Sequence, residues 1–392
     1  MNLEFNFKKM IQIYSNSLGK KELKAIKKVF KSKWLGKGHK TDEFINNFSS
    51  KLTSSIFDSI ASIKPSPHNF LSVNSCTEGI FQIMDLLDIK EGDEVILPSI
   101  SFVGVANAIV SKNAIPIFCD VDPHTLNSSV EHIESKISSK TKAVITLHYA
   151  GVPCDINNIS ELCKKHNIKL IEDNANSPFT TIDGVNTGVI GDFGVWSFDA
   201  MKILVTGDGG MIYAKDPTHI EKLKKLTYLG LESLSGLSNN IDEKWWEFEI
   251  SSPSRRSISN DITSTIGIEQ LKKVDKFIST RKSIYEKYNQ ELKELDWLTL
   301  PNIPSNVKSS YYMYHLQTKN RDKFAAYLKN KGIYTTFRYY PLHWVKFYQN
   351  SETLPNTEYA ANHTVCIPLH QNLNKNEIDY IIHTIKNFKN EK

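Results

Sequence analysis

Between residues 70 and 215, short apolar runs rich in β-branched residues alternate with amphipathic segments. The runs predict strands at 94–97, 115–119, 143–147 and 168–171, and the segments between and before them predict helices at 77–88, 101–112 and around 159–166. Strands that are apolar throughout are typical of a mostly parallel sheet buried on both faces. The sequence therefore predicts a three-layer α/β/α domain. A further helix is expected after residue 128, where Ser128 and Glu131 have the spacing of a capping box.

The second part of the chain has a different pattern. Apolar residues near helical spacing over 262–297 predict one long helix that bridges two domains. A helix at 321–331, an extended segment at 334–340 and a last helix at 375–388 predict a smaller α+β C-terminal domain. We expect a large domain over residues 1–260, with its N-terminal segment packed on the small domain, and the linking helix and small domain over 261–392. The polar stretch 231–259 is expected to loop over a site or an interface.

Composition excludes several classes of protein. The 392 residues carry 48 Lys and Arg against 43 Asp and Glu, a net charge of +5, which is too small for a nucleic-acid-binding surface. No apolar run approaches the roughly 20 residues of a membrane helix, and Glu4 interrupts any leader-like N-terminus. The five cysteines form no Cys-x-x-Cys pair, which argues against zinc. We expect a cytoplasmic protein without a metal, a nucleic-acid partner or a membrane anchor.

Candidate functional residues follow the predicted strands. Ligands of open α/β sheets bind beyond the carboxyl ends of the strands, where Asp173, Ser197 and Lys202 are expected. The segment 74–79, Asn-Ser-Cys-Thr-Glu-Gly, opens the first helix, whose free N–H groups favour an anion. An acid, a lysine and a hydroxyl-rich helix start suit pyridoxal phosphate (PLP), although single charged residues at strand ends are more often solvated surface groups.

The order of the motifs along the chain adds to this argument. They are Trp34–Gly38 (WLGKG), Glu91–Pro98 (EGDEVILP), Asp120–Pro123 (DVDP), Thr146–Gly151 (TLHYAG), Ile171–Asp173 (IED), Ser197–Lys202 (SFDAMK), Thr206–Gly210 (TGDGG), Lys331–Ile333 (KGI) and Arg338–His343 (RYYPLH). In this order they resemble the DegT/StrS family of nucleotide-sugar aminotransferases, which are fold-type-I PLP-dependent enzymes. The resemblance covers nearly the whole chain.

The resemblance implies roles for individual residues. Lys202 matches the lysine that forms the Schiff base, and Asp173 matches the partner of the pyridine nitrogen. The other implied cofactor contacts are the phosphate ligands Ser197, Thr77 and the Cys76 backbone, the ring-covering Phe102, the ring-hydroxyl contact Asn176, and Arg256, which would reach the partner subunit's phosphate.

Several of these residues have a second interpretation. Phe102 can instead be a core residue, and His148, a candidate for the substrate pocket, can instead be a core histidine. Arg338 suits a substrate carboxylate or diphosphate, or a surface acid. Asp120 and Asp122 are interpreted as a turn, and Gly207–Gly210 as a hairpin turn outside the site.

The resemblance implies a transaminase that moves an amino group from L-glutamate, or glutamine, to a nucleotide-linked keto sugar, passing through pyridoxamine phosphate. It also implies a homodimer with shared active sites. The chain departs from the family pattern at Asp199, Phe179 and Arg256, which bears on the substrate and on the contact between subunits. Two alternatives are a sugar dehydratase, in which histidine replaces the lysine, and a PLP-binding sensor without turnover.

Overall fold

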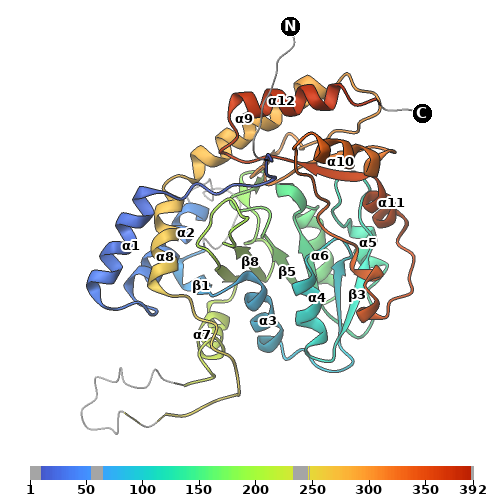
Figure 1. The fold of residues 1–392 in the computed structure, drawn as a ribbon. Coiled ribbons are helices and arrows are strands. Elements are labelled where there is room, and N and C mark those ends of the chain that lie inside the picture. Colours follow the sequence, from blue (N-terminus) through green and yellow to red (C-terminus); the bar gives the residue numbers. More distant parts are fainter. Residues whose placement is uncertain (1–9, 54–64, 233–245, 247, 390–392) are drawn as a thin grey trace.

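The computed structural model describes residues 10–53, 65–232, 246 and 248–389, and its centre is a seven-stranded sheet (Figure 1). The strand order is β1 (Phe70–Val73), β9 (Gly210–Ala214), β8 (Phe193–Ser197), β5 (Lys169–Asp173), β4 (Thr141–Leu147), β2 (Glu94–Pro98) and β3 (Ile115–Cys119). The run from β8 to β3 is parallel, and β9 is antiparallel to both of its neighbours. The predicted mostly parallel sheet is confirmed.

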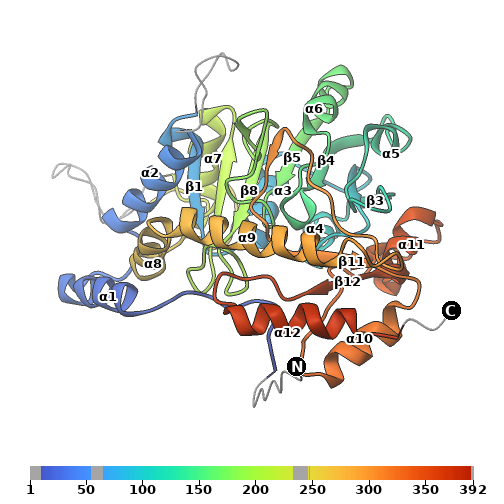
Figure 2. The same ribbon diagram turned by 90° about the horizontal axis from the view of Figure 1, so that it is seen from above.

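Helices cover both faces of this sheet (Figures 1 and 2). One face is covered by α3 (Cys76–Leu86), α4 (Val103–Val110) and α7 (Pro217–Leu226), and the other by α2 (His39–Thr53), α5 (Val130–Glu134) and α6 (Ile156–Lys165). Successive residues of β2 pack on opposite faces of the sheet. Val95 and Leu97 pack with α3 and α4, and Ile96 packs with α6. Because both faces are buried, the strands are apolar without alternation, and the three-layer architecture is confirmed.

A second core lies in the C-terminal part of the chain. It contains α10 (Arg321–Asn330) and α12 (Lys375–Lys386), with a two-stranded sheet of β11 (Tyr314–Gln317) and β12 (Thr364–Ile367). Ile11 packs in this core, and its backbone bonds to Gly332 and Tyr334. Ala360 of α11 (Pro355–His363) belongs to a separate cluster with Cys366. The smaller α+β unit is thus confirmed, while the boundary at residues 260 and 261 stays a prediction.

The long helix expected over 262–297 is wrong, because two helices occupy this stretch. Helix α8 (Asp261–Leu271) is followed by its C-cap residue Lys272, and α9 (Val274–Leu292) begins after Lys273. The break lets the two helices bury different faces. Leu271 packs in the cluster that contains Phe48 of α2. Ile284 and Leu292 instead pack in the C-terminal core. Figure 2 shows α9 extending away from α8 and lying beside α12.

Two further local predictions need correction. The N-cap of α5 is Ser129, whose hydroxyl accepts the N–H of His132 at 3.3 Å, while Ser128 instead donates to the Asp120 carbonyl. The capping box therefore starts one residue later than predicted. The segment 334–340 forms no regular strand, and its pairing is an isolated bridge between Thr336 and Cys366. Helix 321–331 is confirmed as α10 and helix 375–388 as α12.

The remaining elements are short or peripheral. They are α1 (Lys20–Ser32), a small antiparallel sheet of β10 (Val307–Lys308), β6 (Thr181–Ile182) and β7 (Val185–Asn186), and 3₁₀ turns at Pro67–Asn69, Tyr149–Gly151, Leu342–Trp344 and Lys346–Tyr348. The predictions for the N-terminus and for much of 231–259 concern residues outside the described ranges. Among the described helices, none combines the length and the apolarity that a membrane span requires.

The aromatic cluster under the sheet gives a stability prediction. Phe48 has no exposed surface, and its ring contacts Phe44, Phe70, Phe179, Trp196 and Phe198. Phe48→Ala should lower the free energy of unfolding by about 3–5 kcal/mol, because it opens a cavity in this cluster. Urea denaturation followed by tryptophan fluorescence measures the loss.

The matched control is Phe30→Ala on α1, where the ring is 58% exposed. It should change the free energy by no more than about 0.5 kcal/mol. Equal losses in the two variants would contradict the proposed core.

Candidate active site

A cavity of about 280 Å³ lies at the carboxyl ends of β5 and β8. Asp173 is the last residue of β5 and Ser197 the last residue of β8, and these strands are parallel neighbours. Lys202 follows β8 in the turn that leads to β9. The predicted site residues that line the cavity together are Cys76, Thr77, Phe102, Asp173, Ser197, Lys202 and Arg338.

The start of α3 forms one wall of the cavity. Ser75 caps the helix by accepting the N–H of Glu78 at 3.1 Å, and Cys76 and Thr77 are the first helical residues. A Cβ on Gly210 would lie 2.6 Å from the Cys76 nitrogen, and one on Gly104 would lie 2.8 Å from the Thr77 side chain. Glycine at both positions therefore allows β9 and α4 to approach the helix start. The first N–H groups of a helix lack partners within it, and they favour an anion.

Lys202 and Asp173 interact electrostatically across this cavity. Burial raises the pKa of Asp173 above its usual value, although the N–H of Ala175 and the charge of Lys202 oppose that rise. Burial lowers the pKa of Lys202, but Tyr312, Tyr339 and Asp173 outweigh it, and the pKa lies above its usual value. The cavity therefore holds the ammonium group of Lys202 and the carboxylate of Asp173, which is 3% exposed. This pair suits a charged, aromatic ligand with a carbonyl group.

Sequence reasoning missed several residues around Lys202. The Tyr312 hydroxyl lies 3.4 Å from the Lys202 amine, and Tyr339 lines the cavity. Asp208 also lines it, although the turn Gly207–Gly210 was expected to stay outside the site. Asp199, singled out only as a departure from the family pattern, is a lining residue too. Tyr339 is the second residue of the RYYPLH motif and was accessible to that reasoning, but no motif marked Tyr312.

Phe102 and Arg338 stand on the cavity wall. Phe102 is 46% exposed, so it is not a core residue, and its ring meets that of Tyr339 at 6.0 Å between centroids. The Arg338 guanidinium lies 3.1 Å from the Met201 sulfur and 5.9 Å from the centre of the Tyr14 ring. Within the described residues Arg338 forms no ion pair, which leaves its charge available to an anionic ligand.

Three predicted residues are not among those that line the cavity. The side-chain amide of Asn176 is fully buried and has no hydrogen-bond partner in the described structure. His148 is fully buried behind Asp173, where its Nε2 pairs with Glu172 at 3.0 Å and its Nδ1 lies 3.5 Å from the Cys154 sulfur. Arg256 is exposed and stacks on Tyr228 at 5.1 Å.

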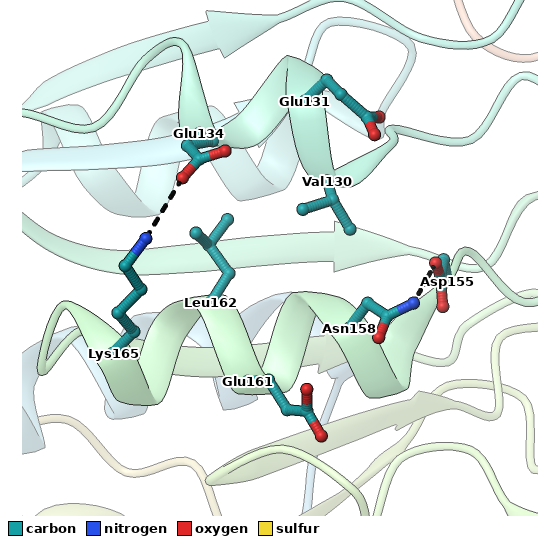
Figure 3. A pocket seen from close by; sticks show the side chains of 8 residues that line it. All are labelled: Val130, Glu131, Glu134, Asp155, Asn158, Glu161, Leu162 and Lys165. Carbon is teal, nitrogen blue, oxygen red and sulfur yellow. Dashed lines mark hydrogen bonds and ion pairs between the residues drawn. The ribbon is translucent and has the colours of Figure 1, made fainter.

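Figure 3 shows a second hollow, of about 540 Å³, between α5 and α6. Its charged rim consists of Glu131, Glu134, Asp155, Glu161 and Lys165. Lys165 pairs with Glu134 at 3.6 Å, and Asn158 donates to Asp155 at 2.8 Å. The excess of carboxylates opposes a phosphate, and the described residues include no group of three side chains arranged for a metal ion. The catalytic candidates lie elsewhere, in the first cavity.

The chain is similar to known proteins over nearly its whole length. The model of the DegT/DnrJ/EryC1/StrS aminotransferase family matches residues 16–386. The chain is 40% identical over 373 residues, 94% of each chain, to dTDP-4-dehydro-2,3,6-trideoxy-D-glucose 4-aminotransferase from Saccharopolyspora spinosa. It is 44% identical to the crystal structure of the aminotransferase TlmJ from Streptoalloteichus hindustanus, with a TM-score of 0.89 over 96% of this chain and 98% of that one.

The same fold occurs in Spr1654 from Streptococcus pneumoniae, in a structure described as its PLP form. There the identity is 24% and the TM-score 0.84, over 96% of this chain and 98% of that one. At this identity the likeness concerns the fold alone.

The buried pair behind Asp173 predicts a pH dependence of stability. Burial lowers the pKa of His148, but Cys154 and Glu172 outweigh it and raise the pKa to about 10. A histidine in the unfolded chain titrates near pH 6.5. The pair therefore stabilises the fold fully below about pH 6.5, and this contribution is lost as the pH rises toward 10.

The variant His148→Gln should lack that contribution. The difference in unfolding free energy between the wild type and the variant should shrink steadily from pH 7 to pH 10, measured by urea denaturation at each pH. His68→Gln, at an exposed position, serves as the control and should keep the wild-type profile. A constant difference across this range would show that His148 is neutral in the folded protein.

Proposed function

The chain belongs to the DegT/DnrJ/EryC1/StrS aminotransferase family, and on that premise we propose that it transfers an amino group from L-glutamate to a nucleotide-linked keto sugar. One observation carries the proposal: Lys202, Asp173 and the start of α3 border a single cavity. The relative from Saccharopolyspora spinosa bears the name of a dTDP-sugar 4-aminotransferase, which makes a dTDP-linked 4-keto sugar the first substrate to test. A cytoplasmic homodimer with shared sites completes the proposal.

The residues of the cavity fit pyridoxal phosphate. The hydroxyls of Thr77 and Ser197 and the N–H groups at the start of α3 would hold the phosphate. Asp173 would face the pyridine nitrogen, and Phe102 would cover the ring. When bound, this cofactor supplies an electron sink for the carbanion at the donor α-carbon and carries the amino group between the two substrates.

Two cofactor contacts rest on the family resemblance. Asn176 would hydrogen-bond the ring hydroxyl. Its buried amide has no partner in the part of the chain that the structure describes, which supports this role, since such groups rarely remain without a bond. Arg256 would reach the phosphate bound in the partner subunit, for which its exposure leaves it available.

Lys202 has two tasks in this reaction. Its amine would anchor the cofactor, and once free it would take the proton from the donor α-carbon and release it again. The keto sugar passes through the same proton transfers in reverse. Asp173 supports both directions, because a carboxylate beside the ring nitrogen favours its protonated form.

The alternatives are less favoured. The dehydratases of this family have a histidine in place of the lysine, whereas this chain has Lys202 at the cavity. A sensor without turnover would need the same cofactor residues, so only an assay distinguishes it from the enzyme.

The test combines the purified protein with PLP, L-glutamate and a panel of dTDP- and UDP-linked 3-keto and 4-keto sugars. Mass spectrometry should detect an amino sugar and an equal amount of 2-oxoglutarate. Borohydride reduction should add the mass of a pyridoxyl group to the peptide that contains Lys202. Lys202→Ala should abolish both signals, because it removes the anchor and the proton carrier together.

Two outcomes would contradict the proposal. Product formation by Lys202→Ala at the wild-type rate would remove Lys202 from the chemistry. A wild-type protein that carries the cofactor on Lys202, yet transfers nothing from glutamate or glutamine to any sugar of the panel, would instead be a sensor.

Arg338 provides a second prediction. Because its guanidinium borders the same cavity as Lys202 and forms no ion pair with a described acid, we expect it to bind a carboxylate of the amino donor. Arg338→Gln should lower kcat/KM for glutamate by about 10- to 100-fold, the effect of a lost charge-assisted hydrogen bond. The half-reaction with the sugar, measured separately from the aminated cofactor, should change little.

The control is Arg255→Gln, since Arg255 pairs with Glu78 and Asp85 and does not line the cavity. It should leave both half-reactions near their wild-type rates. A loss confined to the sugar half-reaction would assign Arg338 to the substrate diphosphate.

A further inference from the structure

Tyr312 makes the hydrogen-bond contact of the Lys202 amine. Its hydroxyl lies 3.4 Å from the amine nitrogen, and its ring centre lies 4.9 Å from the same atom. Tyr312 is 6% exposed, so water competes little for its hydroxyl or its ring. The phenol therefore faces the atom on which the proposed chemistry depends.

The backbone around Tyr312 is fixed to the large domain. The Tyr312 N–H donates to the Ala150 carbonyl at 3.1 Å. The Ser309 hydroxyl donates to the Gly151 carbonyl at 2.8 Å, and the Ser310 hydroxyl donates to the Asn176 carbonyl at 2.9 Å. These acceptors lie in the loops after β4 and β5, so the segment is aligned with the strand end that carries Asp173.

A buried cation holds the same segment from the other side. Arg281 on α9 is 2% exposed, and it forms no ion pair with any described residue. Its guanidinium donates to the carbonyls of Tyr311 (3.3 Å), Tyr312 (3.2 Å) and Leu369 (2.9 Å), and to Gln371 Oε1 at 3.0 Å. Burial lowers the pKa of Arg281 to about 10, and the group is still charged at neutral pH.

A buried arginine without an acid is costly, and its surroundings have to compensate. The compensation here consists of carbonyl groups, two of which belong to consecutive residues. Tyr311 adopts φ = 54°, a left-handed conformation that a residue with a Cβ keeps only where its surroundings fix it. The fork of donors on Arg281 can bridge several acceptors at once, so it fixes the direction in which Tyr312 leaves the backbone.

We propose that Tyr312 is a catalytic residue that holds the free amine of Lys202 during amino transfer, and that Arg281 is a positioning residue that fixes Tyr312. This inference rests on the proposed function. A phenol donates a hydrogen bond to a neutral amine and accepts one from an ammonium ion. The contact therefore persists when Lys202 gains the proton from the donor α-carbon and when it releases that proton, and Tyr312 itself neither gains nor loses one.

The other phenol at the cavity has a different position. Tyr339 influences Lys202 electrostatically, but the hydrogen bond to the amine belongs to Tyr312. Tyr339 packs edge-on against Phe102, on the wall that holds Arg338. Tyr339 therefore lines the cavity, whereas Tyr312 is not a lining residue and contacts the Lys202 amine.

The test uses full-length protein freed of cofactor, so that its main readout does not depend on turnover. Lys202 is labelled with trace acetic anhydride at fixed pH, and the labelled peptide is quantified by mass spectrometry. Tyr312→Phe removes the acceptor of the ammonium ion, so the neutral amine becomes more abundant. Labelling of Lys202 should rise by about tenfold, which corresponds to one pKa unit, and kcat of the loaded enzyme should fall by about tenfold at an unchanged KM.

Tyr288→Phe is the matched control. This tyrosine is fully buried on α9, and its hydroxyl donates to the Pro368 carbonyl at 2.9 Å, away from the cavity. It should leave both the labelling of Lys202 and kcat at wild-type values. If Tyr312→Phe behaves like Tyr288→Phe, Tyr312 has no role at the amine and the proposal is overturned.

A double-variant cycle tests Arg281. Arg281→Lys keeps the charge but loses the fork, and it should raise labelling of Lys202 in the wild-type background. In the Tyr312→Phe background it should add nothing, because Arg281 acts through Tyr312. Equal effects in both backgrounds would mean that Arg281 is only structural.

The labelling result also separates this inference from the function. A labelling change in Tyr312→Phe, combined with a wild type that aminates no sugar, would refute the proposed function and leave the contact between Tyr312 and Lys202 in place.

Discussion

The parallel pairing of β5 with β8 is the constraint on which the rest of the site depends. Because parallel strands end at the same edge of a sheet, Asp173 and Ser197 come to one place, and the turn after β8 brings Lys202 there as well. The antiparallel strand β9 then begins at Gly210, opposite Ser197 and against the start of α3. A change in the order of these strands would separate the acid, the lysine and the anion-binding helix start.

The electrostatics of the cavity give the lysine two states. In the protein alone, burial lowers the pKa of Lys202, but the phenols and Asp173 outweigh it and favour the ammonium form. A cationic N–H beside Asp173 would cancel the field of that carboxylate at Lys202 and so favour the neutral amine. Occupation of the site would therefore prepare the amine for nucleophilic attack, and a group such as Tyr312, which serves both forms, becomes useful.

Patterns of residues predicted those parts of the molecule that local physics determines. Strands such as 115–119 were found because their apolar runs are buried on both faces, and Asp173 and Lys202 were found because ligands collect at strand ends and because the motifs resemble a family. The capping residue of α5 was missed because Ser128 and Ser129 are equally suited to the role. The break after Leu271 was missed because helical spacing continues across it. Only the structure shows that α8 and α9 pack in different cores, which requires a change of direction between them.

Tyr312 and Arg281 show why the remaining site residues could not be predicted. Tyr312 lies 110 residues from Lys202 in the sequence, in a segment without a motif, and Arg281 lies on a helix whose surface is rich in charge. Their relation to the cavity arises from long-range packing, which brings α9 and the segment 309–312 against the loops after β4 and β5. The C-terminal part of the chain therefore contributes directly to the site. It supplies Arg338 and Tyr339 to the cavity that the large sheet builds, and it places Tyr312 against the Lys202 amine, so the alignment of the two cores determines the surroundings of that amine.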